Sequence, residues 1–115
     1  MKVYYLKTCS TCQRILKELP LPESVELQNV KIDPLTAGQL DELYERSGGS
    51  YEALFNRRSR EYRARGLHER ELTEADYHEL LLDHYSFLKR PVLLIGDQTF
   101  VGNSKKTVEA ARAAL

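Results

Sequence analysis

The chain has 115 residues, and its seventeen basic and seventeen acidic side chains cancel to a formal net charge of zero. This length suits one small domain with its own hydrophobic core, residues 1–115, and the balanced charge gives no general attraction to nucleic acid or to a membrane surface. No apolar run is as long as a membrane span, and no signal-like segment opens the sequence, so we expect a cytoplasmic protein.

The first predicted elements flank both cysteines of the chain. Residues 2–6 have the β-branched and aromatic composition of a buried strand, and residues 13–19 place apolar side chains on one helical face. The motif Cys9-Ser10-Thr11-Cys12 therefore lies at a strand-to-helix junction. A helix N-terminus presents unpaired N–H groups and partial positive charge, both of which favour a thiolate.

This position predicts a division of labour between the two thiols. Cys9, at the exposed beginning of the helix, is the predicted nucleophile, and Cys12, one turn later, is placed to attack a mixed disulfide at Cys9. The neighbouring hydroxyls of Thr8, Ser10 and Thr11 are predicted to cap the helix and to donate hydrogen bonds to an anion or a thiolate.

Three other interpretations of the cysteine pair are weaker. Two buried cysteines can pack as small hydrophobes, but the helix-start position favours redox chemistry. A structural zinc site needs about four ligands, and the histidines at positions 68, 78 and 84 have no metal-like spacing to the cysteines, so no metal is expected. Two cysteines also do not form the disulfide framework of a secreted protein.

The remaining elements alternate between strands and helices. We predict a half-exposed strand over residues 25–32, a helix over 36–46 with Leu40 and Leu43 inward, and a short helix from 51 to 55. An arginine-rich stretch over 56–65 then stops at Gly66.

Thr73 reads as the N-cap of the next helix, which runs to about residue 84, with Asp76 completing a near capping box. Strands over 91–95 and 98–101 form a hairpin around Gly96-Asp97. A last helix covers 105–115 after a cap at 103–104, with Val108, Ala111 and Leu115 inward. The order is β-α-β, a helical insertion at about 36–84, then β-β-α. It predicts an α/β, thioredoxin-like (glutaredoxin-type) fold with the insertion between its two halves.

Four segments carry a more specific signal: residues 5–12, residues 54–59 followed by Gly66-Leu67, residues 87–92 with Lys89-Arg90-Pro91-Val92, and residues 100–103. Together they resemble the arsenate reductase family, which also contains Spx-type transcription regulators and glutathione-linked relatives. The resemblance covers nearly the whole chain.

The resemblance implies roles for residues outside the cysteine motif. Cys9 would attack an oxyanion or a disulfide, and Arg90 would clamp the anion beside it. Arg58 would be a second clamp, with Arg57 as its alternative, because a guanidinium can donate two hydrogen bonds to one oxyanion. Pro91 would be the cis-proline of the family, opposite the nucleophile. The other arginines of this stretch, Arg60, Arg63 and Arg65, are interpreted as a solvated helix face.

Two departures from the family pattern concern specificity. Members that use glutaredoxin to reduce arsenate typically carry one cysteine in the first loop and a third arginine in the late hairpin. This sequence has Cys12 as well, and residues 98–104 contain no arginine. Lys105 or Lys106 could supply a charge there, but not a two-oxygen clamp.

The main functional prediction is a thiol-dependent oxidoreductase acting on a small oxyanion or a thiol/disulfide substrate. It would have no tightly bound cofactor and would use glutathione, thioredoxin or glutaredoxin as external reductant. One alternative is an Spx-type regulator whose Cys9–Cys12 disulfide alters binding to RNA polymerase. The other is a non-catalytic thioredoxin-fold binding module. We expect a monomer that meets a redox protein partner and does not contact nucleic acid or a membrane.

Overall fold

The beginning and the end of the chain share one four-stranded sheet in the computed structural model, which describes residues 1–115. The spatial order of the strands is β2-β1-β3-β4. The central strand β1 is parallel to β2 and antiparallel to β3, and β3 and β4 form an antiparallel hairpin. The strands are β1 (Lys2–Tyr5), β2 (Glu26–Asn29), β3 (Val92–Ile95) and β4 (Gln98–Val101). The sheet lies in the first of two compact units, which consists of residues Met1–Asp33 and Arg90–Leu115.

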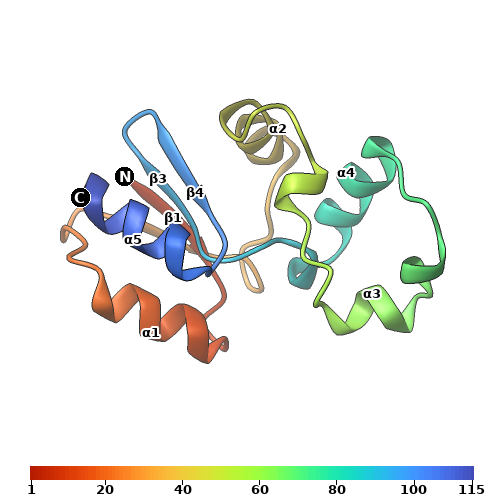
Figure 1. The fold of residues 1–115 in the computed structure, drawn as a ribbon, viewed down its shortest axis with the longest axis horizontal. Coiled ribbons are helices and arrows are strands. Elements are labelled where there is room, and N and C mark those ends of the chain that lie inside the picture. Colours follow the sequence, from red (N-terminus) through yellow and green to blue (C-terminus); the bar gives the residue numbers. More distant parts are fainter. The chain divides into compact units, whose positions relative to one another are not determined.

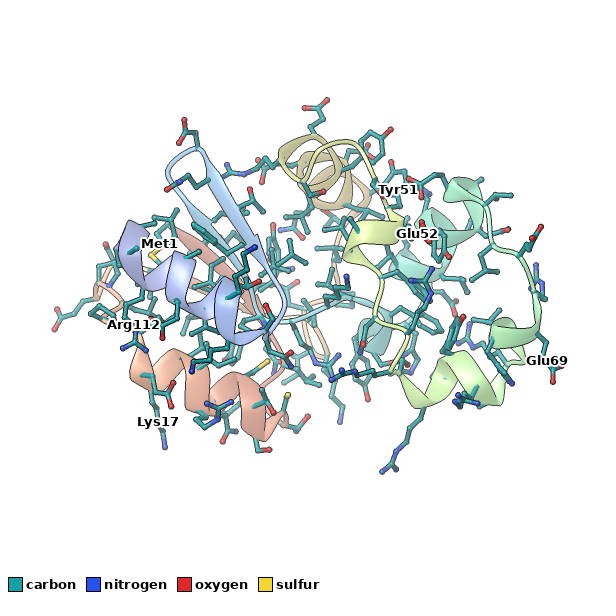
Figure 2. The ribbon with its side chains drawn as sticks, viewed as in Figure 1. Met1, Lys17, Tyr51, Glu52, Glu69 and Arg112 are labelled. Carbon is teal, nitrogen blue, oxygen red and sulfur yellow. The ribbon has the colours of Figure 1, made fainter.

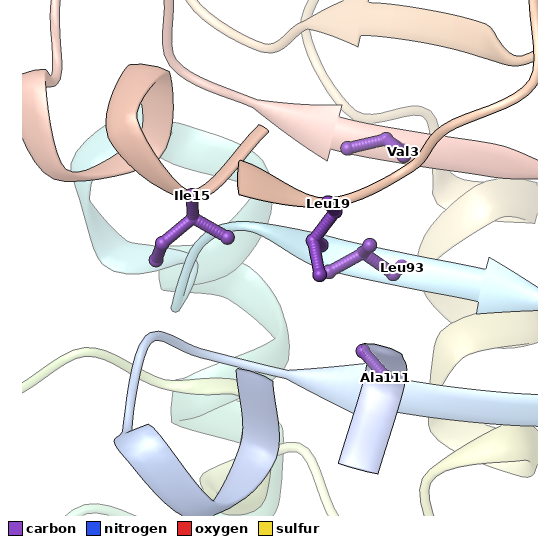
Figure 3. Close-up of a cluster of buried hydrophobic side chains, with 5 residues drawn as sticks. All are labelled: Val3, Ile15, Leu19, Leu93 and Ala111. Carbon is purple, nitrogen blue, oxygen red and sulfur yellow. The ribbon is translucent and has the colours of Figure 1, made fainter. Parts of the chain in front are cut away.

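Two helices from opposite ends of the chain pack on one face of this sheet, α1 (Ser10–Glu18) and α5 (Lys105–Ala114) (Figure 1). The polar side of α1 faces solvent, where Lys17 projects away from the sheet (Figure 2). The inward side chains form a cluster in which none is more than 4% exposed (Figure 3): Val3, Ile15, Leu19, Leu93 and Ala111. Burying one leucine or isoleucine stabilises a fold by about 1.5–3 kcal/mol, so this cluster anchors α1 and its cysteine motif to the sheet.

The edge strand β2 differs from the sequence expectation. It covers only Glu26–Asn29, and Leu27 is 48% exposed whereas Gln28 is 5% exposed. Leu27 lies beside Val3 on the helix-covered face, but α5 packs over β3 and β4, which lie toward the opposite edge of the sheet. Gln28 can be buried because its Nε2 donates a hydrogen bond to the carbonyl of Asp33 at 3.0 Å. The predicted half-exposed strand is therefore shorter than residues 25–32, and it buries a glutamine rather than the leucine beside it.

The last helix, α5, differs from the sequence expectation in one position. Ala111 is completely buried, and Val108 packs against the cluster as expected. Leu115, predicted to face inward, is 39% exposed. The helix ends at Ala114, so Leu115 lies beyond the last turn that touches the sheet.

The second unit, Pro34–Lys89, is helical. Its capping signals are strong: Thr36 and Thr73 both begin helices with complete capping boxes, and Gly66 adopts the left-handed conformation at φ 70° after α3. Its helices are α2 (Ala37–Arg46), α3 (Arg60–Ala64) and α4 (Glu74–Asp83), and the short 3₁₀ helices are η1 (Glu52–Leu54), η2 (Leu67–Glu69) and η3 (Tyr85–Phe87).

Phe55 lies at the centre of this helical unit. It is completely buried, and its ring centroid lies 5.1 Å from that of Phe87 and 4.9 Å from that of Tyr77. Backbone hydrogen bonds join the same region, because the N–H of Asn56 donates to the carbonyl of Phe87 at 2.7 Å. The segment that precedes the arginine-rich stretch is therefore attached to η3.

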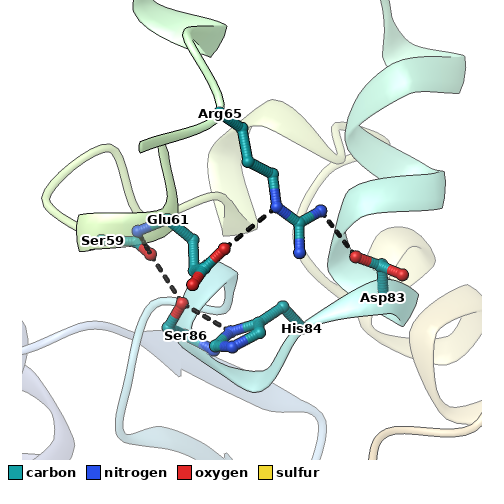
Figure 4. Close-up of polar contacts among 6 residues, drawn as sticks. All are labelled: Ser59, Glu61, Arg65, Asp83, His84 and Ser86. Atoms are coloured by element: carbon teal, nitrogen blue, oxygen red, sulfur yellow. Dashed lines mark hydrogen bonds and ion pairs between the residues drawn. The ribbon is translucent and has the colours of Figure 1, made fainter. Parts of the chain in front are cut away.

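Arg65 is not part of a freely solvated helix face. Its guanidinium pairs with Glu61 at 3.0 Å and with Asp83 at 2.6 Å (Figure 4), and it lies 5.2 Å from the ring centroid of Phe87. Arg65 is exposed, as expected, but its ion pair with Asp83, which comes from another helix, is a contact that the sequence did not reveal. Arg60 and Arg63 are exposed, as expected.

A chain of hydrogen bonds fixes the start of α3. The hydroxyls of Ser59 and Ser86 lie 2.6 Å apart, and that of Ser86 lies 2.8 Å from Nδ1 of His84 (Figure 4). Ser59 also caps α3 by accepting a hydrogen bond from the N–H of Glu61. These contacts join α3 to η3 and make His84 a structural residue of this unit.

The observed order of elements is β-α-β, a run of helices, then β-β-α. It confirms the predicted α/β, thioredoxin-like fold with helices between its two halves. None of the helices is both long and apolar enough to cross a membrane.

Candidate active site

Cys9 is the last residue before the first turn of α1. Its backbone is extended, with φ −88° and ψ 112°, and its carbonyl accepts a hydrogen bond from the N–H of Gln13 at 3.1 Å. No side-chain oxygen caps this end of the helix. The predicted capping role of Thr8, Ser10 and Thr11 is therefore wrong, because Cys9 itself occupies the N-cap position and the two hydroxyls that follow it lie inside the first turn.

The environment of Cys9 favours its thiolate. Burial raises the pKa of this thiol, but hydrogen bonds from the N–H and the thiol of Cys12, the positive charge of Arg90 and the N–H of Thr11 together outweigh it. The pKa of Cys9 therefore lies below its ordinary value. The thiol is also partly exposed, so a substrate can reach it.

Cys12 has the opposite character. Its side chain is completely buried, and its pKa is raised to about 11, mainly by this burial, although a hydrogen bond to the backbone of Leu6 and the charge of Arg90 oppose the shift. The neighbouring Cys9 contributes to this raised pKa, since two adjacent thiolates repel each other. Both cysteines are reduced in the structure. Cys9 is therefore the thiol that loses its proton more readily, and Cys12 is the one that keeps it.

Arg90 and Pro91 lie at the start of β3, in the same unit as the cysteines. The charge of Arg90 lowers the pKa of both thiols, and its Nε atom is buried. The peptide bond between Arg90 and Pro91 is cis, the conformation that the family resemblance implied for Pro91. The carbonyl of Pro91 accepts a hydrogen bond from the N–H of Gly102 at 2.9 Å, which ties this bend to the end of β4.

The hydroxyl residues around Cys9 differ in exposure. Thr8 and Ser10 are exposed, whereas Thr11 is partly buried and places its N–H toward the Cys9 sulfur. Their predicted contact with a substrate stays a prediction.

Arg58, the predicted second clamp, belongs to the helical unit. It is exposed, and its N–H donates a hydrogen bond to Oδ1 of Asn56 at 3.1 Å. Its neighbour Arg57 is already engaged, because Nη2 lies 2.6 Å from Oε2 of Glu52 and 2.9 Å from the hydroxyl of Tyr77. Arg58 is therefore the better candidate of the two, and its contact with a substrate stays a prediction.

Two further residues hold the loop that leads to Cys9, and the sequence did not reveal them. Gln13 on α1 donates a hydrogen bond from Nε2 to the carbonyl of Lys7, and Oδ1 of Asn29 on β2 accepts one from the N–H of Lys7 at 3.4 Å. Gln13 directly follows the cysteine motif and Asn29 ends a strand, but neither position distinguishes these residues from ordinary surface amides.

The late hairpin supplies no arginine, and Lys105 and Lys106 are exposed in the first turn of α5. No group of three or more histidine, cysteine, aspartate or glutamate side chains is arranged to hold a metal ion. The chemistry of the described residues is therefore that of two thiols beside an arginine.

Comparison with known proteins identifies a family and a relative that match most of the chain. The model of the ArsC family matches residues 4–111. The uncharacterized protein YusI of Bacillus subtilis (strain 168) is 30% identical over 103 residues, which cover 86% of each chain.

Two solved structures are similar over nearly their full length. A YFFB protein has a TM-score of 0.79 at 27% identity and covers 99% of this chain and 97% of its own. A possible arsenate reductase from Streptococcus mutans UA159 has a TM-score of 0.72 at 25% identity and covers 96% of this chain and 95% of its own. The chain therefore belongs to the ArsC family.

Proposed function

We propose that this protein is a thiol-dependent reductase in which Cys9 attacks the substrate and Cys12 resolves the resulting adduct. The observation that carries this proposal is the contrast between the two thiols. The pKa of Cys9 is lowered at a helix N-terminus, whereas Cys12 is buried beside it with a pKa raised to about 11. A nucleophile and a thiol that reacts only after it are what such a reaction needs.

With arsenate as substrate, the Cys9 thiolate attacks arsenic and forms an S–As bond, and an oxygen leaves as water after protonation. Cys12 then gives up its proton and attacks the Cys9 sulfur. The S–S bond forms as the S–As bond breaks, and the electron pair of that bond stays on arsenic. Arsenic(V) is thereby reduced to arsenic(III), which leaves as arsenite, and the two thiols are oxidised to a disulfide.

With a disulfide as substrate, the same residues exchange thiols instead. Cys9 attacks one sulfur and the other leaves as a thiolate, and Cys12 then attacks Cys9 and releases the second thiol. In both cases an external thiol, from glutathione, thioredoxin or glutaredoxin, reduces the Cys9–Cys12 disulfide and completes the cycle. No tightly bound cofactor takes part in this proposal.

Arg90 has two functions in the proposed reaction. Its charge favours the Cys9 thiolate, and its guanidinium binds the oxygens of an anionic substrate. Arg58 is proposed to add a second clamp, and Thr8, Ser10, Thr11 and the bend at Pro91 are proposed to line the substrate position. The absence of an arginine in residues 98–104 leaves one fewer oxygen clamp than the typical arsenate reductase pattern, which favours a disulfide over arsenate.

We further propose a cytoplasmic monomer whose partner is the redox protein that reduces it. An Spx-type regulator would also use the hydrogen-bonded Cys9–Cys12 pair, as a disulfide switch. Binding to RNA polymerase that depends on the redox state would favour that alternative.

Turnover assays test the proposal. Purified protein is supplied with arsenate or with a glutathionylated peptide, and either glutathione plus glutaredoxin or thioredoxin serves as reductant. We expect turnover that is lost in Cys9→Ser. In Cys12→Ser the reaction should stop at a Cys9 adduct unless an external thiol replaces Cys12. A wild-type protein with no Cys9-dependent turnover on either substrate would contradict the proposal.

A further inference from the structure

The loop between β1 and α1 is held from two sides at one residue. Lys7 has its carbonyl bound by Nε2 of Gln13 and its N–H bound by Oδ1 of Asn29 at 3.4 Å. Gln13 belongs to the second turn of α1 and Asn29 to the end of β2. Two amide side chains from two different elements therefore bind both polar groups of one loop residue.

The contact made by Asn29 extends beyond Lys7. The same Oδ1 lies 3.4 Å from the N–H of Lys31, and the carbonyl of Asn29 accepts hydrogen bonds from the N–H groups of Ile32 and Asp33 at 3.1 and 2.8 Å. The loops that follow the parallel strands β1 and β2 are thus joined through Asn29. The Asn29 side chain accounts for the contacts with Lys7 and Lys31, and its backbone carbonyl for those with Ile32 and Asp33.

The held loop leads directly to the nucleophile. The N–H of Cys9 donates a hydrogen bond to the carbonyl of Leu6 at 3.0 Å, and the Cys12 sulfur is hydrogen-bonded to the backbone of Leu6. Lys7 follows Leu6, so a shift of Lys7 would move Cys9 relative to the helix N-terminus and would disturb the contact between Leu6 and Cys12. The attraction between an anion and a helix N-terminus falls off within the first turn, so a small shift changes thiol reactivity.

We propose that Gln13 and Asn29 are positioning residues for Cys9: they grip the carbonyl and the N–H of Lys7 and so fix the loop that presents the Cys9 sulfur to the first N–H groups of α1. This inference rests on the proposed function, because it assumes that Cys9 is the reacting thiol. The contact of Gln13 carries the larger effect, since the 3.4 Å contact of Asn29 lies at the long end of hydrogen-bond distances.

The test is the pH profile of alkylation at Cys9 by iodoacetamide, followed by peptide mass spectrometry. Gln13→Met keeps the length and the helix propensity of the side chain but removes its donor. We expect the profile to shift to higher pH and alkylation below the midpoint to slow about threefold. Asn29→Ala should shift it in the same direction by less. Asn29→Asp keeps the oxygen acceptor but adds a negative charge. In 1 M salt, which screens charges beyond about 3 Å, this variant should have the wild-type profile.

Lys17→Met is the matched control. Lys17 lies on the same helix, eight residues after Cys9, which corresponds to about 12 Å along the helix axis. This distance exceeds the screening length of about 10 Å at 0.1 M salt. Its profile should equal that of the wild type. Thermal melting is recorded for all variants.

The outcomes separate the two proposals. If Gln13→Met lowers the melting temperature but leaves the alkylation profile unchanged, Gln13 has only a structural role and the inference is overturned. If Gln13→Met does not fold, the variants Asn29→Ala and Asn29→Asp test the inference alone. An unchanged alkylation profile in Asn29→Ala then overturns it. If wild-type Cys9 already reacts like a free thiol, the proposed function fails first.

Discussion

The thiol of Cys12 donates a hydrogen bond to the sulfur of Cys9, so that one cysteine stabilises the thiolate of the other. This pairing separates the reactivities of two thiols that are only three positions apart in the sequence. At neutral pH we expect iodoacetamide to modify Cys9 and to leave Cys12 intact, because Cys12 is completely buried and its pKa is raised to about 11. Peptide mapping after brief labelling measures this selectivity. Equal labelling of both cysteines in the folded protein would argue against it.

The two thiols should also change stability with pH in opposite directions. Cys12 has a folded pKa above the ordinary value of 9.0, so its contribution is fully present below pH 9 and is lost as the pH rises toward 11. Cys9 has a lowered folded pKa, so its contribution is present above the ordinary value and is lost as the pH falls through the folded one.

Urea unfolding between pH 9 and 11 isolates the Cys12 effect. Lysines and tyrosines also titrate in this pH range, but the wild type and Cys12→Ser contain the same ones. Their contributions therefore cancel when the free energies of unfolding of the two proteins are subtracted. We expect the free energy of unfolding to fall less steeply in Cys12→Ser. Parallel curves would show that Cys12 has no raised pKa.

Substitutions of Arg90 distinguish its charge from its shape. Arg90→Lys keeps a positive charge but loses the planar fork, so we expect KM for an oxyanion substrate to rise about tenfold, the loss of about 1.5 kcal/mol of charge-assisted hydrogen bonding. Arg90→Met should have the same effect and should also raise the pKa of Cys9, because its charge is a cause of the lowered value. Steady-state kinetics combined with Cys9 labelling separates the two effects. A KM unchanged in both variants would remove Arg90 from the anion site.

Within the helical unit, Arg65 and Arg63 form a matched pair. Arg65, at the C-cap of α3, pairs with Glu61 and Asp83 and lies over the ring of Phe87. Arg63 lies in the last turn of the same helix and is also exposed. We expect Arg65→Met to lower the free energy of unfolding by about 1–2 kcal/mol, and Arg63→Met by less than about 0.5 kcal/mol. Denaturant titration measures both, and equal effects would contradict the observed contacts.

Much of the fold could be predicted because local chemistry determines it. Thr73 and Asp76 supply a complete capping box, and Gly66 adopts the left-handed conformation after α3. The hairpin around Gly96-Asp97 was equally local. Such signals need only a few neighbouring residues, so they are visible in a single sequence.

The failures involve contacts between distant residues. The exposure of Leu27 on the edge strand β2 depends on how far α5 extends over the sheet, which no local pattern encodes. The ion pair of Arg65 with Asp83 joins two helices. In the candidate site, Cys9, Cys12 and Arg90 could be predicted from the motif and the resemblance, whereas Gln13 and Asn29 act on the backbone of Lys7 and leave no signature in residue type.

The exposure of Leu27 on β2 makes a prediction of its own. Leu27→Thr should change the free energy of unfolding by no more than about 0.5 kcal/mol, because this side chain is 48% exposed. Leu93→Ala, in the buried cluster at 2% exposure, should cost about 2–5 kcal/mol. Denaturant titration compares them. A large loss in Leu27→Thr would mean that this edge position is covered.

The central claim is that Cys9 attacks and Cys12 resolves. Mass spectrometry of protein quenched by alkylation after exposure to glutathione disulfide or arsenate tests it most directly. The account predicts a Cys9–Cys12 disulfide in the wild type, an adduct trapped on Cys9 in Cys12→Ser, and neither product in Cys9→Ser. An adduct that forms first on Cys12, or a Cys9 that stays unmodified in all three proteins, would contradict it.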